Sequence, residues 1–121
     1  EIFNTSKNLK VGVLNLMGNI YMKKCQDVFL EAKKFINTFK LKKDADFIIV
    51  DFHGEITSEK MAIAYLFDGK ITMIVGTHTH VPTSDHRIMT QSPNLKPKQD
   101  FADAHCSCGD VRHMISVINQ C

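Results

Sequence analysis

The stretch Asp46-Phe-Ile-Ile-Val-Asp-Phe52 decides the fold class of this chain. It is a nearly continuous apolar run of strand length, which is typical of a strand in a sheet that is covered on both faces. Residues 71–75 repeat this composition, and residues 10–17 form a similar run before the turn pair Gly18-Asn19. We therefore predict strands near residues 10–17, 46–52 and 70–76.

A helix is predicted over residues 26–40, between the first two strands. Its apolar side chains recur every three or four positions and form one stripe, made by Val28, Phe29, Ala32, Phe35, Ile36 and Phe39. The opposite face carries polar and charged side chains, namely Lys33, Lys34, Asn37 and Lys40.

A second, shorter helix is predicted over residues 58–67. Thr57 and Ser58 offer a cap, and Gly69 is expected to end the helix. Its predicted apolar face consists of Met61, Ala62, Tyr65 and Leu66. Residues 87–89 could start one more strand. The order strand, helix, strand, helix, strand predicts an α/β fold with right-handed crossovers and a mostly parallel or mixed layered sheet.

The composition fits one compact domain. The chain has 121 residues, of which 44% are hydrophobic and 23% charged, and its formal net charge of +2 does not predict nucleic acid as a partner. No apolar run approaches the roughly 18 residues of a membrane helix, and the first residues lack a signal-peptide pattern. We expect a cytoplasmic protein with free thiols at its cysteines and no membrane partner. Because Glu1 is not an initiator methionine, we expect that the chain was cut, processed or taken from a longer frame.

Three histidines follow the ends of the two best strands. His53 comes directly after the run 46–52, and His78 and His80 follow the run 71–75. Ligands collect at the carboxyl ends of strands in open α/β sheets, so two neighbouring strands would bring these loops together. In an extended segment His78 and His80 would project to the same side and could face one metal or two adjacent metals. Each histidine alone also fits an ordinary polar loop.

Carboxylates near these histidines have more than one possible role. Asp51 lies two residues before His53, where it either orients a metal ligand or is satisfied by nearby backbone. Glu55 and Glu59 could supply a further carboxylate. Glu59 is expected in the first turn of the helix, where negative charge is favoured.

Longer motifs around these residues match a known family. Asp51-Phe-His-Gly-Glu-Ile-Thr-Ser-Glu-Lys60 and Val75-Gly-Thr-His-Thr-His-Val81, with Asp68-Gly69 between them and Thr83, Asp85, Arg87 and Ile88 after them, resemble the YmdB-like family of calcineurin-type metallophosphoesterases. The stretch Val13-Leu-Asn-Leu-Met-Gly18 also resembles the family's strand leading into this region. The resemblance implies a fragment of a calcineurin-like α/β sandwich.

The resemblance also implies a chemistry. Enzymes of that family hydrolyse phosphodiesters, 2′,3′-cyclic nucleotides among them, at a centre of two divalent transition metals, which we expect to be Mn, Fe or Zn. By resemblance, His53 and His78 are ligands of one metal and His80 is a ligand of the other. Two cations about 3.5 to 4 Å apart activate a water and stabilise the leaving oxygen. A small phosphodiester is the implied substrate.

The family's first half, with its bridging Glu and the Asn-His pair that supplies the general acid, has no counterpart here. We therefore expect residues 1–89 to be the C-terminal half of the domain and residues 90–121 to be a divergent linker and tail. The unfamiliar sequence of the tail suggests a disrupted or partly frame-shifted gene copy. Without the general acid, the chain alone is expected to be weak or inactive.

Two other interpretations stay open. His105, Cys106, Cys108, His113 and Cys121 could form a small zinc-binding module in the tail, although Cys-x-Cys is tighter than the usual knuckle. Alternatively, the chain is a non-catalytic remnant, whose uncovered sheet face would favour self-association into a homo-oligomer.

Overall fold

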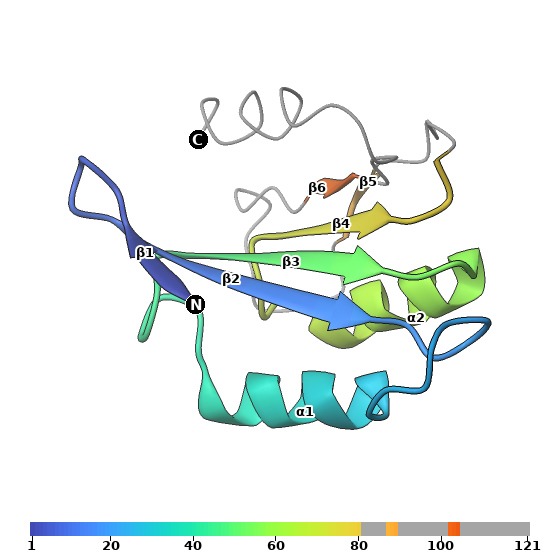
Figure 1. The fold of residues 1–121 in the computed structure, drawn as a ribbon. Coiled ribbons are helices and arrows are strands. Elements are labelled where there is room, and N and C mark those ends of the chain that lie inside the picture. The colour runs from blue at the N-terminus through green and yellow to red at the C-terminus, as the bar shows by residue number, and fades with distance from the viewer. Residues whose placement is uncertain (81–86, 90–101, 105–121) are drawn as a thin grey trace.

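The computed structural model describes residues 1–80, 87–89 and 102–104. These residues form one mixed sheet and two helices (Figure 1). The strands are β1 (Ile2–Asn4), β2 (Lys10–Met17), β3 (Phe47–His53), β4 (Met73–Thr77), β5 (Arg87–Ile88) and β6 (Ala102–Ala104). The helices are α1 (Val28–Thr38) and α2 (Thr57–Phe67).

The strand order is β1-β2-β3-β4-β6-β5. Strands β2, β3, β4 and β6 run parallel, and β1 and β5 pair antiparallel at the two edges. The helices α1 and α2 connect the three long parallel strands, as the sequence order requires. The prediction of a mixed α/β sheet is therefore confirmed, and its three predicted strands each lie within a few residues of the observed ones.

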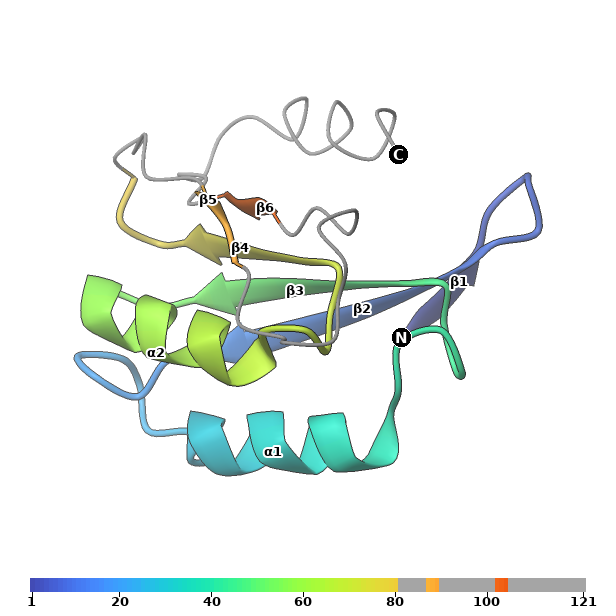
Figure 2. The ribbon, with the colours of Figure 1, turned by 180° about the vertical axis from the view of Figure 1, so that it is seen from behind.

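Both helices lie on one face of the sheet, as Figures 1 and 2 show from opposite sides. The side chains of β3 alternate strictly, so that Ile48, Val50 and Phe52 are fully buried beneath the helices while the residues between them are half-buried. Phe35 of α1 packs edge-on against Phe67 of α2, with ring centroids 6.3 Å apart. These apolar groups form the core of the described domain.

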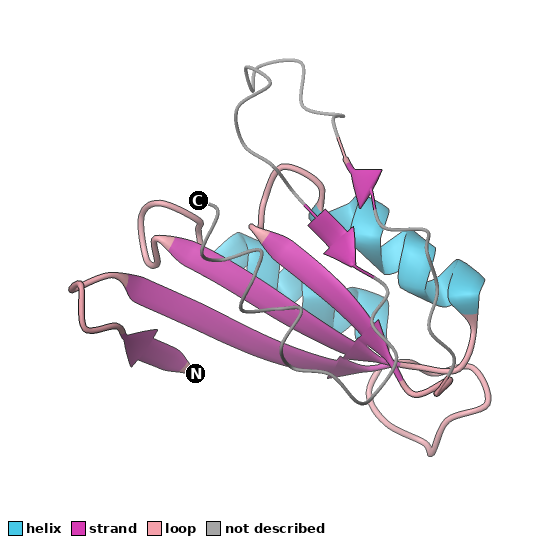
Figure 3. Ribbon diagram, turned by 90° about the horizontal axis from the view of Figure 1, so that it is seen from above, coloured by secondary structure: helices cyan, strands magenta, loops and turns pink. Residues whose placement is uncertain are grey.

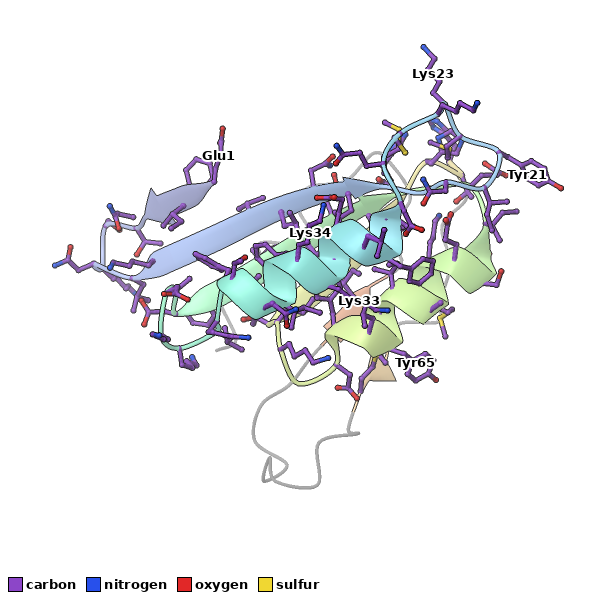
Figure 4. The ribbon with its side chains drawn as sticks, turned by 90° about the horizontal axis from the view of Figure 1, so that it is seen from below. Glu1, Tyr21, Lys23, Lys33, Lys34 and Tyr65 are labelled. Carbon is purple, nitrogen blue, oxygen red and sulfur yellow. The ribbon has the colours of Figure 1, made fainter. Side chains whose placement is uncertain are left out.

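Helix α1 presents the predicted apolar stripe. Val28 and Ala32 are buried, and the four other predicted side chains pack against the core. Asp27 caps the helix, because its Oδ1 accepts hydrogen bonds from the backbone N–H groups of Phe29 at 2.8 Å and Leu30 at 3.1 Å. Lys33 and Lys34 lie on the surface that faces away from the sheet (Figure 4).

Helix α2 corrects two sequence-based expectations. Its buried apolar residues are Ile63, Ala64 and Phe67, whereas the predicted face included Ala62 and Tyr65, which are exposed. The buried face begins with Glu59 and Lys60, two residues before the predicted Met61 and Ala62, so charged residues concealed it from a search for apolar periodicity. Thr57 and Ser58 are not the cap, because the helix already begins at Thr57 and Ile56 occupies the cap position. Gly69, with φ of 71°, follows the helix end as expected.

Glu59 is buried because it holds the loop after β2. Its side chain is 4% exposed, and its two oxygens accept the backbone N–H groups of Asn19 at 2.8 Å and Ile20 at 3.4 Å. Asn19 continues this connection, since its Oδ1 accepts the backbone N–H of Val28 at 2.8 Å. One carboxylate at the start of α2 therefore links the end of β2 to the start of α1.

Gly18 and Gly54 allow the loop after β2 to lie against the end of β3. A Cβ on Gly18 would lie 2.5 Å from Glu59 Oε2 and 3.3 Å from Gly54 Cα. Such a contact is too short for any side chain. Gly18 is therefore required by close packing between two backbone segments and a hydrogen-bonded carboxylate.

Strands β1 and β6 were not expected from the sequence. Each has three residues, which is too few for an alternation of apolar and polar side chains to be recognised. Strand β6 lies within the region expected to be linker and tail, between β4 and β5 in the sheet. The proposed tail cluster at His105, Cys106, Cys108, His113 and Cys121 lies outside the described residues. Neither described helix is long and apolar enough to cross a membrane.

We predict that Asp27→Ala lowers the free energy of unfolding by about 0.5 to 2 kcal/mol, because two backbone N–H groups of α1 lose their acceptor. Thr57→Ala is the matched control, since Thr57 is inside α2 and does not occupy the cap. Urea denaturation followed by circular dichroism measures both. Equal effects of the two substitutions would contradict the assignment of the cap.

We also predict that Gly18→Ala destabilises the protein by about 1 to 3 kcal/mol, because the new methyl group displaces Glu59 from its hydrogen bonds. Gly12→Ala serves for comparison, since a Cβ there meets the ring of Phe39 at 3.1 Å and a small ring shift relieves it. The same denaturation experiment measures both changes. A smaller loss for Gly18→Ala than for Gly12→Ala would contradict the role of this packing.

Candidate metal centre

The carboxyl ends of β2, β3 and β4 are aligned at one edge of the sheet. Met17 is in register with His53, and His53 is in register with Thr77. The loops after these strands remain attached to one another, because Gly18 N donates to His53 O at 2.9 Å and Gly54 N donates to Thr77 O at 3.3 Å. Side chains that follow the three strands are thereby placed at a common edge.

The three histidines predicted from the sequence lie together at this edge. His53 Nε2 and His78 Nδ1 are 3.1 Å apart, with ring centroids 4.8 Å apart and planes nearly perpendicular at 86°. The ring of His80 lies 6.5 Å from that of His78, centroid to centroid. His53 and His78 are half-buried and His80 is exposed. The edge therefore holds one close pair of imidazoles and a third at its rim.

The backbone that carries His78 and His80 differs from the extended segment that was expected. Strand β4 ends at Thr77, and both histidines adopt positive φ, 104° for His78 and 57° for His80. The 104° angle lies outside the small left-handed region that non-glycine residues tolerate. Residues held in such conformations concentrate at functional sites, where the surroundings keep them in place. The turn, rather than strand alternation, brings the ring of His78 onto His53.

Side chains on the face of the sheet opposite the helices lead to the pair. Figure 3 views the sheet with the helices behind it. Asn15 Nδ2 donates to Asp51 Oδ2 at 2.7 Å, and Thr77 Oγ1 donates to Asp51 Oδ1 at 3.0 Å. The same Thr77 oxygen lies 3.0 Å from His53 Nδ1. Two roles were left open for Asp51, namely orienting a metal ligand and hydrogen bonding to nearby backbone. The hydrogen bonds described here join it to side chains of the neighbouring strands, which is the arrangement that the first role requires.

Glu55 belongs to the site and Glu59 does not. Glu55 Oε2 lies 3.1 Å from His78 Nε2, with side chains that are 45% and 34% exposed. Glu59 is in the first turn of α2 as expected, but its oxygens are used by the loop after β2. Thr77 is the site residue that sequence reasoning missed, although its position directly before His78 is a signal that could have identified it.

The donor set fits part of a metal coordination sphere. Two nitrogen ligands at about 2.0 to 2.1 Å from one ion, at angles between octahedral and tetrahedral, are separated by about 2.9 to 3.4 Å. The 3.1 Å between His53 Nε2 and His78 Nδ1 lies in this range. Within the described residues no three His, Cys, Asp or Glu side chains are grouped closely enough to hold an ion by themselves. The pair thus has the spacing of two ligands of one ion.

Comparisons with known proteins agree on a family. The chain is 41% identical over 80 residues to the 2′,3′-cyclic-nucleotide 2′-phosphodiesterase of Bacillus subtilis, which covers 66% of this chain and 30% of that protein. The curated relatives that it matches are much longer, and it spans 27–30% of their length.

Solved structures share the fold. The crystal structure of a phosphatase from Mycoplasma pneumoniae matches with a TM-score of 0.67 and 39% identity, over 90% of this chain and 34% of that chain. A hypothetical protein from Thermus thermophilus matches with a TM-score of 0.70 and 26% identity, over 92% of this chain and 40% of that chain. These matches confirm the predicted fold class, a fragment of a calcineurin-like α/β sandwich. Since the family model described as YmdB-like protein matches residues 1–95, the chain belongs to the YmdB-like family.

Proposed function

We propose that this chain carries part of the active site of a metal-dependent phosphodiesterase acting on 2′,3′-cyclic nucleotides. The observation that carries the proposal is the 3.1 Å approach of His53 Nε2 and His78 Nδ1 at the carboxyl edge of the sheet. The name of the Bacillus subtilis relative supports the substrate class. Such an enzyme takes a small phosphodiester and needs no membrane or nucleic-acid partner, and we infer a cytoplasmic location from its substrate.

The proposed ligands are divided between two divalent transition metals. His53 and His78 would hold one ion, and His80, at the rim, would hold the other. Neutral imidazole is a ligand that Zn, Fe and, less selectively, Mn accept. When bound, the metal pair supplies a water activated at neutral pH and stabilisation of phosphoryl charge.

In this proposal the residues of this chain hold the metal in place, and they do not transfer a proton. His53 is held at the end of a fully paired strand, and the turn after β4 places His78 beside it. Both imidazoles would thus approach a bound ion from one side, and the strand-held His53 would lose little conformational freedom on binding it. The bridging carboxylate and the general acid are assigned to a family region outside this chain, with residues 1–89 as the C-terminal half and residues 90–121 as a divergent tail.

Metal binding is the first test. We expect the 121-residue chain to bind Zn²⁺ or Mn²⁺ in isothermal titration calorimetry, and His78→Ala to weaken binding by more than about 100-fold, because the ion loses a direct ligand. Asn37→Ala, an exposed change on α1, is the matched control. Loss of zinc on changing Cys106 and Cys108 instead would favour the tail module. Absence of any metal binding would favour a non-catalytic remnant.

Hydrolysis is the second test. We expect a complete form, carrying the remaining family region, to hydrolyse 2′,3′-cyclic AMP in the presence of Mn²⁺, and a chelator to abolish turnover. The 121-residue chain alone should be about 10² to 10⁴ slower, because it lacks the general acid. A steady-state assay compares the two. Rapid chelator-sensitive turnover by the shorter chain would show that the essential groups are misassigned.

A further inference from the structure

Six polar side chains form a continuous row of close polar contacts across the face of the sheet opposite the helices and along its carboxyl edge. The polar row runs, in order of contact, through Asn15, Asp51, Thr77, His53, His78 and Glu55. Each neighbouring pair is 2.7 to 3.1 Å apart. Three strands and two loops contribute to it, so it depends on the register of the sheet rather than on one local motif.

The donors and acceptors of this row can be assigned from its ionised carboxylate outward. The Asp51 carboxylate only accepts, and it accepts from the Asn15 amide and the Thr77 hydroxyl. A hydroxyl has a single proton, which Thr77 donates to Asp51, so Thr77 can only accept from its other neighbour, His53 Nδ1. His53 Nδ1 must therefore carry a proton, and in the neutral ring the lone pair is on Nε2.

The same reasoning applies from the other end of the row. The Glu55 carboxylate lies 3.1 Å from His78 Nε2 and can only accept, so a proton on Nε2 makes this contact favourable and the neutral ring of His78 then has its lone pair on Nδ1. Two ring nitrogens with lone pairs then face each other across 3.1 Å. That arrangement is favourable when a cation lies between them, and a divalent metal satisfies both at once.

We propose that Asp51 and Thr77 are positioning residues that set the tautomer of His53 and so direct its Nε2 lone pair toward the metal position. This inference deepens the proposed function and rests on it for the identity of the ligand. Asp51 acts through the Thr77 hydroxyl and does not touch His53 itself in the contacts described. Metal-bound histidines are commonly oriented in this way by a partner on the second ring nitrogen.

The Asp51 side of the row should matter more than the Glu55 side. The hydrogen bonds of Thr77 to Asp51 and to His53 are part-buried. The Glu55 carboxylate is 45% exposed, and water competes with His78 for an exposed carboxylate, since even fully charged exposed pairs contribute little. A change at Asp51 or Thr77 is therefore the sharper test.

For Asp51→Asn we can predict which tautomer of His53 is favoured. The Asn15 amide requires an acceptor, which places the new carbonyl oxygen toward Asn15 and the new NH₂ toward Thr77. The NH₂ would donate to the Thr77 hydroxyl, which would then donate to His53 Nδ1. His53 should change to the tautomer with its proton on Nε2. That nitrogen then has no lone pair for the metal.

The experiment uses the metal-free 121-residue chain in mildly alkaline buffer, where imidazole is neutral. Two-bond ¹H–¹⁵N correlation spectra report which ring nitrogen of His53 is protonated, and calorimetry with Zn²⁺ alone reports affinity. We expect a protonated Nδ1 in the unsubstituted chain, a protonated Nε2 in Asp51→Asn, and a 10- to 100-fold loss of zinc affinity, roughly, in that variant. Asp46→Asn, the same charge change at the opposite end of β3, should alter neither.

Thr77→Val provides a second variant of nearly equal shape. We expect it to remove the preference for the Nδ1–H tautomer and to weaken zinc binding, whereas Thr77→Ser, which keeps the hydroxyl, should restore both. Circular dichroism confirms that each variant is folded. A protonated Nε2 in the unsubstituted chain overturns the proposal without any variant, and so does an unchanged tautomer in folded Asp51→Asn and Thr77→Val.

These outcomes are separate from those that test the proposed function. The tautomer is measured without metal and without substrate. If the complete protein fails to hydrolyse a cyclic nucleotide while the tautomer and zinc results hold, the proposed function is wrong and the positioning role stands. If hydrolysis occurs while His53 carries its proton on Nε2, the positioning role is wrong and the function stands.

Discussion

The parallel register of β3 between β2 and β4 is the constraint on which the rest of the molecule depends. Successive side chains of a strand point to opposite faces, so a slip of one residue exchanges the two sets. In the observed register Ile48, Val50 and Phe52 face the helices, while Asp51 and His53 take the alternate positions. Burial of three large apolar groups, each contributing about 1.5 to 3 kcal/mol, therefore also fixes where the polar groups lie.

The helices hold the carboxyl edge in place from below. Glu59 at the start of α2 accepts from the loop after β2, and Gly18 and Gly54 let the two loops approach closely. A carboxylate buried in this way stabilises the loop only while its hydrogen bonds are intact. The packing core and the candidate site are thus connected through one short loop and one helix terminus.

The parts of the fold with strong apolar signals could be predicted from the sequence. Strands β3 and β4 and the stripe of α1 follow from uninterrupted apolar runs and a clear three-and-four period. The face of α2 could not be predicted, because Glu59 and Lys60 are buried by tertiary contacts that apolar periodicity does not report. Strands β1 and β6 depend on pairing with β2 and β4, since three residues carry no period of their own.

The grouping of His53, His78 and His80 at one edge could be predicted from the sequence, whereas the detailed geometry of the candidate site could not. Strand order alone brought His53 and His78 to one edge, but the φ of 104° at His78 depends on the turn that follows β4. The role of Thr77 could not be predicted, because threonine is β-branched and is common in strands whether or not its hydroxyl has a function. Its hydroxyl acquires a role only when β3 and β4 pair and place Asp51 on one side and His53 on the other.

The two histidines differ in how they are held, and this difference bears on how an incomplete site can still be organised. His53 is fixed by a paired strand and a part-buried hydrogen bond, whereas His78 stands on a turn with an exposed carboxylate as its partner. A ligand fixed on a strand keeps its direction whether or not an ion is bound. A ligand on a turn can follow the ion and the remaining ligands when they arrive. Since the pair would supply only part of the proposed coordination sphere, this division would allow the strand to define the metal position and the turn to adapt to the groups that complete it.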